Sequence, residues 1–80
     1  MAQFEFLGRL SERFDSPVQL SIPDDVTTIA ALRPWLDKHF NCEVFAHPSI
    51  RAIVNQDMAM DMSVISNHDI IVFYPPVGGG

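Results

Sequence analysis

The sequence has few thiols and little positive charge. It holds one cysteine, Cys42, and five Lys and Arg against ten Asp and Glu, which gives a net charge of −5 over 80 residues. A single cysteine cannot form an internal disulfide, which agrees with a reducing compartment. Proteins bind nucleic acid largely by neutralising phosphates with Lys and Arg, so we expect no nucleic-acid partner. A protein partner with a basic surface fits this charge better.

Long hydrophobic runs and a targeting segment are also missing. No stretch is apolar for long enough to span a bilayer, and the start "MAQFEF" lacks a basic region followed by an apolar one. We therefore expect no membrane partner and a cytoplasmic location. The 48% of hydrophobic and 19% of charged residues are typical of a globular protein. Eighty residues suffice for one domain but leave no room for a deep active-site cleft.

The usual catalytic and metal-binding patterns are absent as well. Nothing resembles a nucleophile–base pair or a phosphate-binding glycine loop. No neighbouring pattern makes Cys42 a reactive thiol of low pKa. His39, Cys42 and His47 match no strong template of ligand spacing, so we expect no metal site. The remaining sulfur atoms, in the methionines of "MAMDM" at 58 to 62, are interpreted as strand packing.

Alternating apolar residues predict most of the strands. Residues 3–7 and 18–22 read as an antiparallel hairpin whose connection holds a single helical turn with Leu10 and Phe14. Residues 50–55 and 69–74 supply two further strands. Residues 58–62 suit a short edge strand with an acidic outer residue.

One helix is predicted between the second and third strands. Thr27 or Thr28 is a suitable N-cap, and the helix should run to about residue 40. Pro34 conflicts with a regular helix, because an interior proline costs about 3 kcal/mol. We therefore expect a kink or a late start near Pro34. Apolar residues recur at spacings of three and four and form one buried stripe, namely Ile29, Leu32, Leu36 and Phe40.

The last strand and the segment after it are unusual. Residues 70 to 74 are all apolar, which is typical of a strand buried on both faces. One helix can cover only one face of the sheet, so we expect a second protein to cover the other. The chain then reads "PPVGGG" from 75 to 80. Pro75 and Pro76 lack N–H donors and should stop strand pairing. We predict a domain at 1–74 and an extended tail at 75–80 that could reach about 20 Å.

Several segments together resemble a known family. They are "FEFLGRLSERF" at the start, "TTIAALRPWL" on the helix, "VNQ" at 54 to 56 and "HDIIVFYPPVGGG" from 68 to 80. The chain resembles the small subunits of molybdopterin synthase, which are ubiquitin-like sulfur-carrier proteins. The resemblance implies the β-grasp fold, an α+β fold with a mixed sheet and one main helix packed on one face. Two positions depart from the family pattern: His68 replaces a common glycine, and Gly78 replaces a common Ala, Ser or Thr.

The resemblance also implies a function for the tail. A ubiquitin-activating-like adenylyltransferase would use ATP to adenylate the carboxylate of Gly80, and a sulfur donor protein would convert the adenylate to a thiocarboxylate. That sulfur would pass to a pterin precursor inside the large subunit of molybdopterin synthase. The chain would then be a non-catalytic, sulfur-carrying subunit of a heteromer, with two small chains on a dimer of large ones. It would bind no permanent cofactor.

The resemblance implies roles for further residues of the C-terminal segment. Glycine at the end admits the same carboxyl group to two narrow active sites. Docking would use whichever of Phe73 and Tyr74 faces outward. The residues that would insert into the partner are Pro75, Pro76, Val77, Gly78 and Gly79.

Other functions remain open from the sequence. Sulfur donation to thiamine or to tRNA would use the same chemistry. A ubiquitin-like modifier would instead join Gly80 to lysines of target proteins; since Lys38 is the only lysine, chains built on internal lysines are nearly excluded. A third class is an interaction module whose terminal carboxylate is inert.

Overall fold

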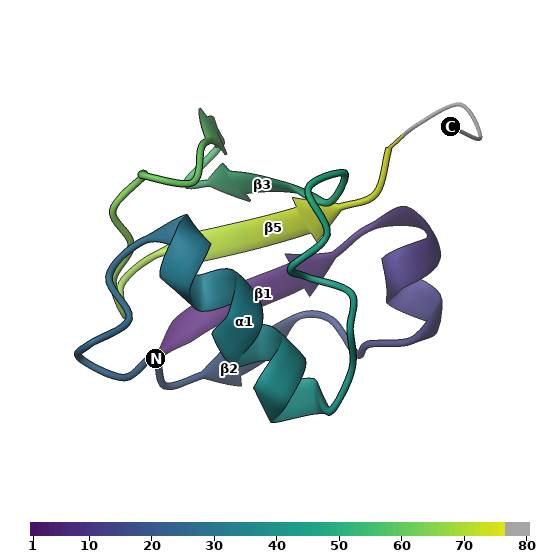
Figure 1. The fold of residues 1–80 in the computed structure, drawn as a ribbon, viewed down its shortest axis with the longest axis horizontal. Helices are drawn as coiled ribbons and strands as arrows, with labels where there is room; N and C mark the ends of the chain where they lie inside the picture. Colours follow the sequence, from purple (N-terminus) through teal and green to yellow (C-terminus); the bar gives the residue numbers. More distant parts are fainter. Residues whose placement is uncertain (77–80) are drawn as a thin grey trace.

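In the part of the chain that the structure describes, a five-stranded mixed sheet carries one α-helix on one of its faces (Figure 1). The computed structural model describes residues 1–76. Within that part of the chain, no helix is long and apolar enough to cross a membrane. The elements in chain order are β1 (Ala2–Phe6), the 3-10 helix η1 (Gly8–Glu12), β2 (Val18–Leu20), α1 (Ile29–Phe40), β3 (Arg51–Val54), β4 (Asp57–Ala59) and β5 (Ile70–Tyr74).

The strand order in the sheet is β2-β1-β5-β3-β4. The first two strands form the expected antiparallel hairpin, and η1 supplies the expected helical turn between them. The central strands β1 and β5 run parallel, so the end of β5 lies beside the start of η1 (Figure 1). This is the β-grasp arrangement, which confirms the expected fold.

The two faces of the sheet follow from alternation along the strands. In β1, Ala2, Phe4 and Phe6 are buried against α1, while Gln3 and Glu5 point to the other face. The parallel register aligns Phe6 with Phe73, so Phe73 also points toward the helix. The uniformly apolar β5 therefore places apolar side chains on both faces of the sheet.

Helix α1 begins at Ile29, directly after its N-cap. The Thr28 side chain accepts a hydrogen bond from the backbone N–H of Ala31 (3.3 Å). The predicted late start near Pro34 is wrong. Burying Ile29, Leu32 and Leu36 contributes roughly 1.5–3 kcal/mol each, which outweighs the cost of about 3 kcal/mol for an interior proline.

An aromatic cluster fills the core between α1 and the sheet. Phe45, which lies in the irregular segment after α1, is fully buried and lies near Phe40 of α1 as well as rings of the sheet. Its ring centroid lies 5.5 Å from that of Phe6 and 5.3 Å from that of Phe73. Aromatic pairs at such distances add stability beyond the area they bury. The core therefore depends on a residue outside the regular elements.

The methionines do not pack as predicted. Strand β4 ends at Ala59, because the backbone N–H of Met60 donates to Ser63 Oγ and the N–H of Ser63 donates to Met60 O (both 2.9 Å). These bonds form a turn instead of further strand pairing. Met58, Met60 and Met62 are 69%, 77% and 79% exposed, so the interpretation as buried strand packing is wrong.

Candidate functional site

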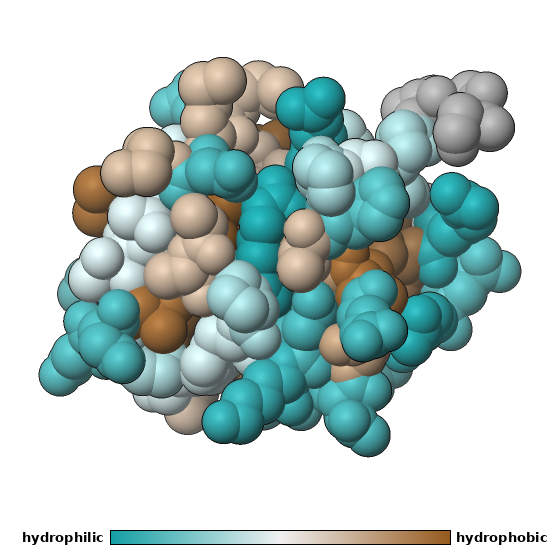
Figure 2. Space-filling model, in the orientation of Figure 1, coloured by the Kyte–Doolittle hydropathy of each residue, from teal (hydrophilic) through white to brown (hydrophobic). Residues whose placement is uncertain are grey.

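The face of the sheet opposite α1 carries an apolar surface. Pairing places Ile53 of β3 opposite both Val72 of β5 and Met58 of β4, so these side chains form a row on that face. Leu7 and Ile70 are 47% and 45% exposed. By contrast, the side covered by α1 is largely hydrophilic along its lower and right-hand margins (Figure 2). We call the apolar surface the open face; its apolar members are Leu7, Ile53, Met58, Ile70, Val72 and Tyr74.

A groove runs along the open face to the root of the tail. It consists of two adjoining pockets of about 440 and 530 Å³, which share Leu7 and Ile53. The first pocket includes Tyr74, Pro75 and Pro76, and the second extends over β5 toward the β3–β4 hairpin. An exposed apolar groove of this kind is typical of a surface that binds another molecule.

The two aromatic residues predicted for docking point in opposite directions. Phe73 is fully buried and packs edge-on against Phe45, so it cannot contact a partner in this fold. Of the two alternatives that the sequence left open, Phe73 is thus the one that faces the core. Tyr74 is half-buried and lies on the open face, where its hydroxyl donates a hydrogen bond to Met58 Sδ (3.6 Å). Of the pair, Tyr74 is therefore the residue that a partner could reach.

The prolines mark the end of sheet pairing. Strand β5 ends at Tyr74, and Pro75 and Pro76 are half-buried beyond it. Gly8 has φ +57°, and a Cβ atom added there would lie 3.3 Å from Pro75 Cγ. A glycine thus allows η1 to approach the root of the tail closely.

The remaining tail residues, Val77, Gly78, Gly79 and Gly80, lie outside the described residues. Their predicted roles in insertion and sulfur transfer therefore stay predictions. The division into a domain at 1–74 and a tail at 75–80 also stays a prediction.

Cys42 belongs to a structural loop. Its thiol donates to Asp37 Oδ1 (3.4 Å), and the Asp37 carboxylate also accepts backbone N–H bonds from Val44, Phe45 and Ala46 (2.9, 2.7 and 3.0 Å). Burial raises the pKa of the Cys42 thiol, and the hydrogen bond to Asp37 and its negative charge raise it further. A raised pKa makes a thiolate nucleophile scarce at neutral pH.

The histidines near Cys42 do not complete a metal centre. The ring Nδ1 of His47 is engaged locally with the hydroxyl (2.7 Å) and the backbone N–H of Ser49, and His39 stacks on Trp35. Within residues 1–76, no three His, Cys, Asp or Glu side chains gather closely enough to hold a metal ion.

Sequence reasoning missed Leu7 and Ile53, which join the two pockets. A signal for Leu7 was present: it continues the outward alternation of Gln3 and Glu5, yet it is apolar. For Ile53 the sequence held no comparable signal, because neighbouring residues in its strand are apolar too.

Comparison with known proteins identifies the family. A model of the ThiS family matches residues 4–80. The solution structure of the Haloferax volcanii HVO 2177 protein has a similar fold, with a TM-score of 0.72 and 17% sequence identity over 99% of this chain and 85% of that one. No curated protein sequence matches the chain. Since the family match covers nearly the whole chain, the protein belongs to the ThiS family of ubiquitin-like sulfur carriers.

Proposed function

We propose that the chain carries sulfur on the carboxyl group of Gly80 for the synthesis of molybdopterin. The observation that carries this proposal is the apolar groove, which in a ThiS-family chain runs directly to Pro75 and Pro76. The groove provides a docking surface at the point where the tail leaves the domain. The Phe73-Tyr74-Pro75-Pro76 sequence favours the pterin branch over thiamine or tRNA thiolation by resemblance.

The chemistry must be supplied by partner proteins. A free α-carboxylate has a pKa near 3.5, is anionic at neutral pH and resists nucleophiles. An adenylyltransferase activates it: a carboxylate oxygen attacks the α-phosphate of ATP, and pyrophosphate leaves. Sulfide (HS⁻) supplied by a donor protein then attacks the acyl carbon, the bond from that carbon to the phosphate oxygen breaks, and AMP leaves, so that the chain ends in a thiocarboxylate. ATP belongs to the activating enzyme, and the chain itself holds no permanent cofactor.

The open face offsets the cost of ordering the tail. Fixing three glycines costs roughly 1–2 kcal/mol each. Full burial of one large apolar side chain contributes about 1.5–3 kcal/mol. Leu7, Ile53 and Tyr74 are already partly buried, so covering them would offset a part of the ordering cost. We propose that the large synthase subunit and the adenylyltransferase both use this face, with basic residues around the apolar contact to match the net charge of −5.

Intact mass spectrometry of the protein purified from its native host tests this function. A carrier should show replacement of one terminal oxygen by sulfur, located by fragmentation to the peptide that ends at Gly80. The same mass gain should appear when the purified chain is incubated with the adenylyltransferase, ATP and a sulfur donor. A population joined to many cellular proteins would instead identify a modifier. A terminus that stays a carboxylate under both conditions would disprove the carrier function.

A further inference from the structure

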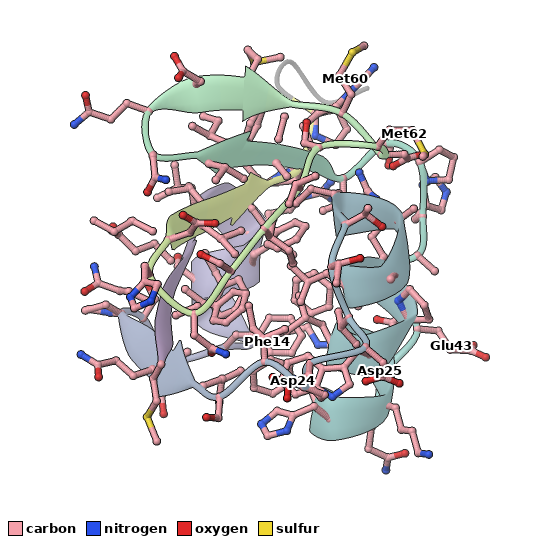
Figure 3. The ribbon with its side chains drawn as sticks, turned by 90° about the vertical axis from the view of Figure 1, so that its left-hand side faces the viewer. Phe14, Asp24, Asp25, Glu43, Met60 and Met62 are labelled. Atoms are coloured by element: carbon pink, nitrogen blue, oxygen red, sulfur yellow. The ribbon has the colours of Figure 1, made fainter. Side chains whose placement is uncertain are left out.

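Three methionines at alternate positions of the β4 region are unusually exposed. Met58, Met60 and Met62 have 69%, 77% and 79% of their surface accessible, although methionine is among the residues most often buried. Figure 3 shows Met60 and Met62 projecting outward from one end of the molecule. The corresponding upper-left margin of Figure 2, at the β3 end of the sheet, carries a group of apolar residues. Peroxides convert accessible methionine thioethers to sulfoxides.

Met58 differs from the other two in what it touches. It lies in β4 on the open face, and its sulfur accepts the hydrogen bond from the Tyr74 hydroxyl at 3.6 Å. Met60 and Met62 lie beyond the end of β4, in the turn that Ser63 closes. Of the three, Met58 is thus the one whose sulfur contacts Tyr74.

We propose that Met58 is a site of reversible oxidation by peroxide. Its oxidation changes the open face through the hydrogen bond that Met58 accepts from Tyr74. The thioether lone pair attacks one oxygen of the peroxide, the O–O bond breaks, and an S–O bond forms. Sulfur loses two electrons and the peroxide gains them; when the peroxide is hydrogen peroxide, its second oxygen leaves with both protons as water. The product is methionine sulfoxide, which reductases can restore to methionine.

Oxidation of Met58 changes the group that accepts the hydrogen bond from the Tyr74 hydroxyl. A thioether sulfur is a weak hydrogen-bond acceptor. A sulfoxide oxygen is strongly polarised and converts an apolar side chain into a polar one. Oxidation therefore gives the Tyr74 hydroxyl a stronger acceptor and places a polar group beside Tyr74, which lines the groove. The consequence for docking rests on the proposed function. The oxidised carrier should dock more weakly, because the partner must then cover an S–O group with an apolar contact.

The single tyrosine of the chain makes the local effect measurable. Protein with isotope-labelled tyrosine is titrated with hydrogen peroxide, and NMR follows the Tyr74 ring signals. Mass spectrometry with peptide fragmentation locates each added oxygen and separates it from sulfur at the terminus, which has nearly the same mass. We expect the Tyr74 signals to shift in step with oxidation of Met58 and to return after treatment with methionine sulfoxide reductases.

Matched variants separate Met58 from its neighbours. Met58→Leu should abolish the shift, and the double variant Met60→Leu/Met62→Leu should retain it. Unchanged Tyr74 signals at full oxidation of Met58, or an equal shift in Met58→Leu, would overturn the proposal.

A second measurement tests the consequence for docking. In the Met60→Leu/Met62→Leu background, oxidation should lower the affinity for the large subunit at least tenfold. A shift of Tyr74 with unchanged affinity would overturn the docking consequence. The NMR result does not depend on whether Gly80 carries sulfur, so failure of the proposed function would be recognised separately.

Discussion

Phe73 and Tyr74 are neighbours in β5 that face opposite sides of the sheet. Phe73 contributes its ring to the core, where it meets Phe45. Tyr74 lines the groove beside Pro75. Equivalent substitutions at these two positions should therefore act on different properties, Phe73 on folding and Tyr74 on docking.

Tyr74→Asp should leave the fold intact and weaken binding to the large subunit at least tenfold, because a charge would replace an apolar contact in the groove. Phe73→Asp should instead unfold much of the population. It removes a buried ring and buries a charge, at a cost of at least about 3 kcal/mol out of a total of roughly 4–12. Calorimetric titration and circular dichroism measure the two effects. Tyr74→Phe is the control and should bind nearly as wild type. A folded Tyr74→Asp variant with unchanged affinity would place docking elsewhere.

The β3–β4 turn contains a residue in an unfavourable backbone conformation. Asn55 and Gln56 have φ 51° and 74°, as both central residues of such a two-residue turn require. Glutamine in the left-handed region costs roughly 1–2 kcal/mol, whereas glycine there loses about 0.5–1 kcal/mol of entropy.

Gln56→Gly should therefore stabilise the protein by about 0.5–1 kcal/mol. The measurement is the urea midpoint at constant m value. Gln56→Ala keeps the Cβ atom and should show no such gain. If glycine and alanine gave equal stability, backbone strain would not be the cause.

At the scale of elements, hydrogen bonds connect the end of α1 to the segment that places Phe45 in the core. Burial alone would raise the pKa of Asp37, but the backbone hydrogen bonds from Phe45, Val44 and Ala46, and the bond from Cys42, together hold that pKa below its ordinary value. A lowered pKa in the folded state means that the ionised carboxylate stabilises the fold. This contribution is complete above the ordinary pKa of about 4 and is lost as pH falls through the lowered folded value.

Asp37→Asn should reduce the free energy of unfolding by about 1–3 kcal/mol at pH 7, because hydrogen bonds to a charged acceptor are replaced by weaker ones. The difference from wild type should shrink as pH falls below 4. Urea unfolding at a series of pH values measures it. Glu43→Gln, in the same loop but with an exposed side chain, serves as the control. A loss of stability that stayed constant down to pH 2 would argue against the ionised form of Asp37 as the source.

At the scale of the whole molecule, the proposed function assigns docking and chemistry to different parts of the chain. The proposed docking surface lies on the sheet, whereas the chemistry would occur on a carboxyl group several residues beyond it. Changes at the end of the tail should therefore affect transfer and leave folding unchanged. Removing Gly79 and Gly80 should weaken docking only modestly and eliminate sulfur transfer.

Adding one residue after Gly80 should abolish sulfur transfer, because the reactive carboxyl group becomes part of an amide. Thermal unfolding of the extended chain should match that of wild type. Transfer is measured by the appearance of the thiocarboxylate in the reconstituted reaction. Proteolytic removal of the added residue should restore activity. Transfer by an extended chain that mass spectrometry shows to be untrimmed would contradict the mechanism.

Local features of the sequence determined the elements and part of the site. The alternation in β1 assigned Phe4 and Phe6 to the core, since successive side chains of a strand point to opposite faces. The spacing of apolar residues assigned the buried stripe of α1. The missing N–H groups of Pro75 and Pro76 predicted where pairing of β5 ends. Each of these inferences depends on a residue and its near neighbours in the chain.

The tertiary structure decided the features that depend on partners distant in sequence. In the uniformly apolar β5, alternation alone does not say which face meets the helix; the parallel register with β1, which aligns Phe6 with Phe73, does. The groove needs Ile53 of β3, Tyr74 of β5 and Leu7, which directly follows β1, and their proximity follows from the order of strands in the sheet. The exposure of Met60 and Met62 follows from the turn that Ser63 closes, because its hydrogen bonds end β4 before the methionine pattern does.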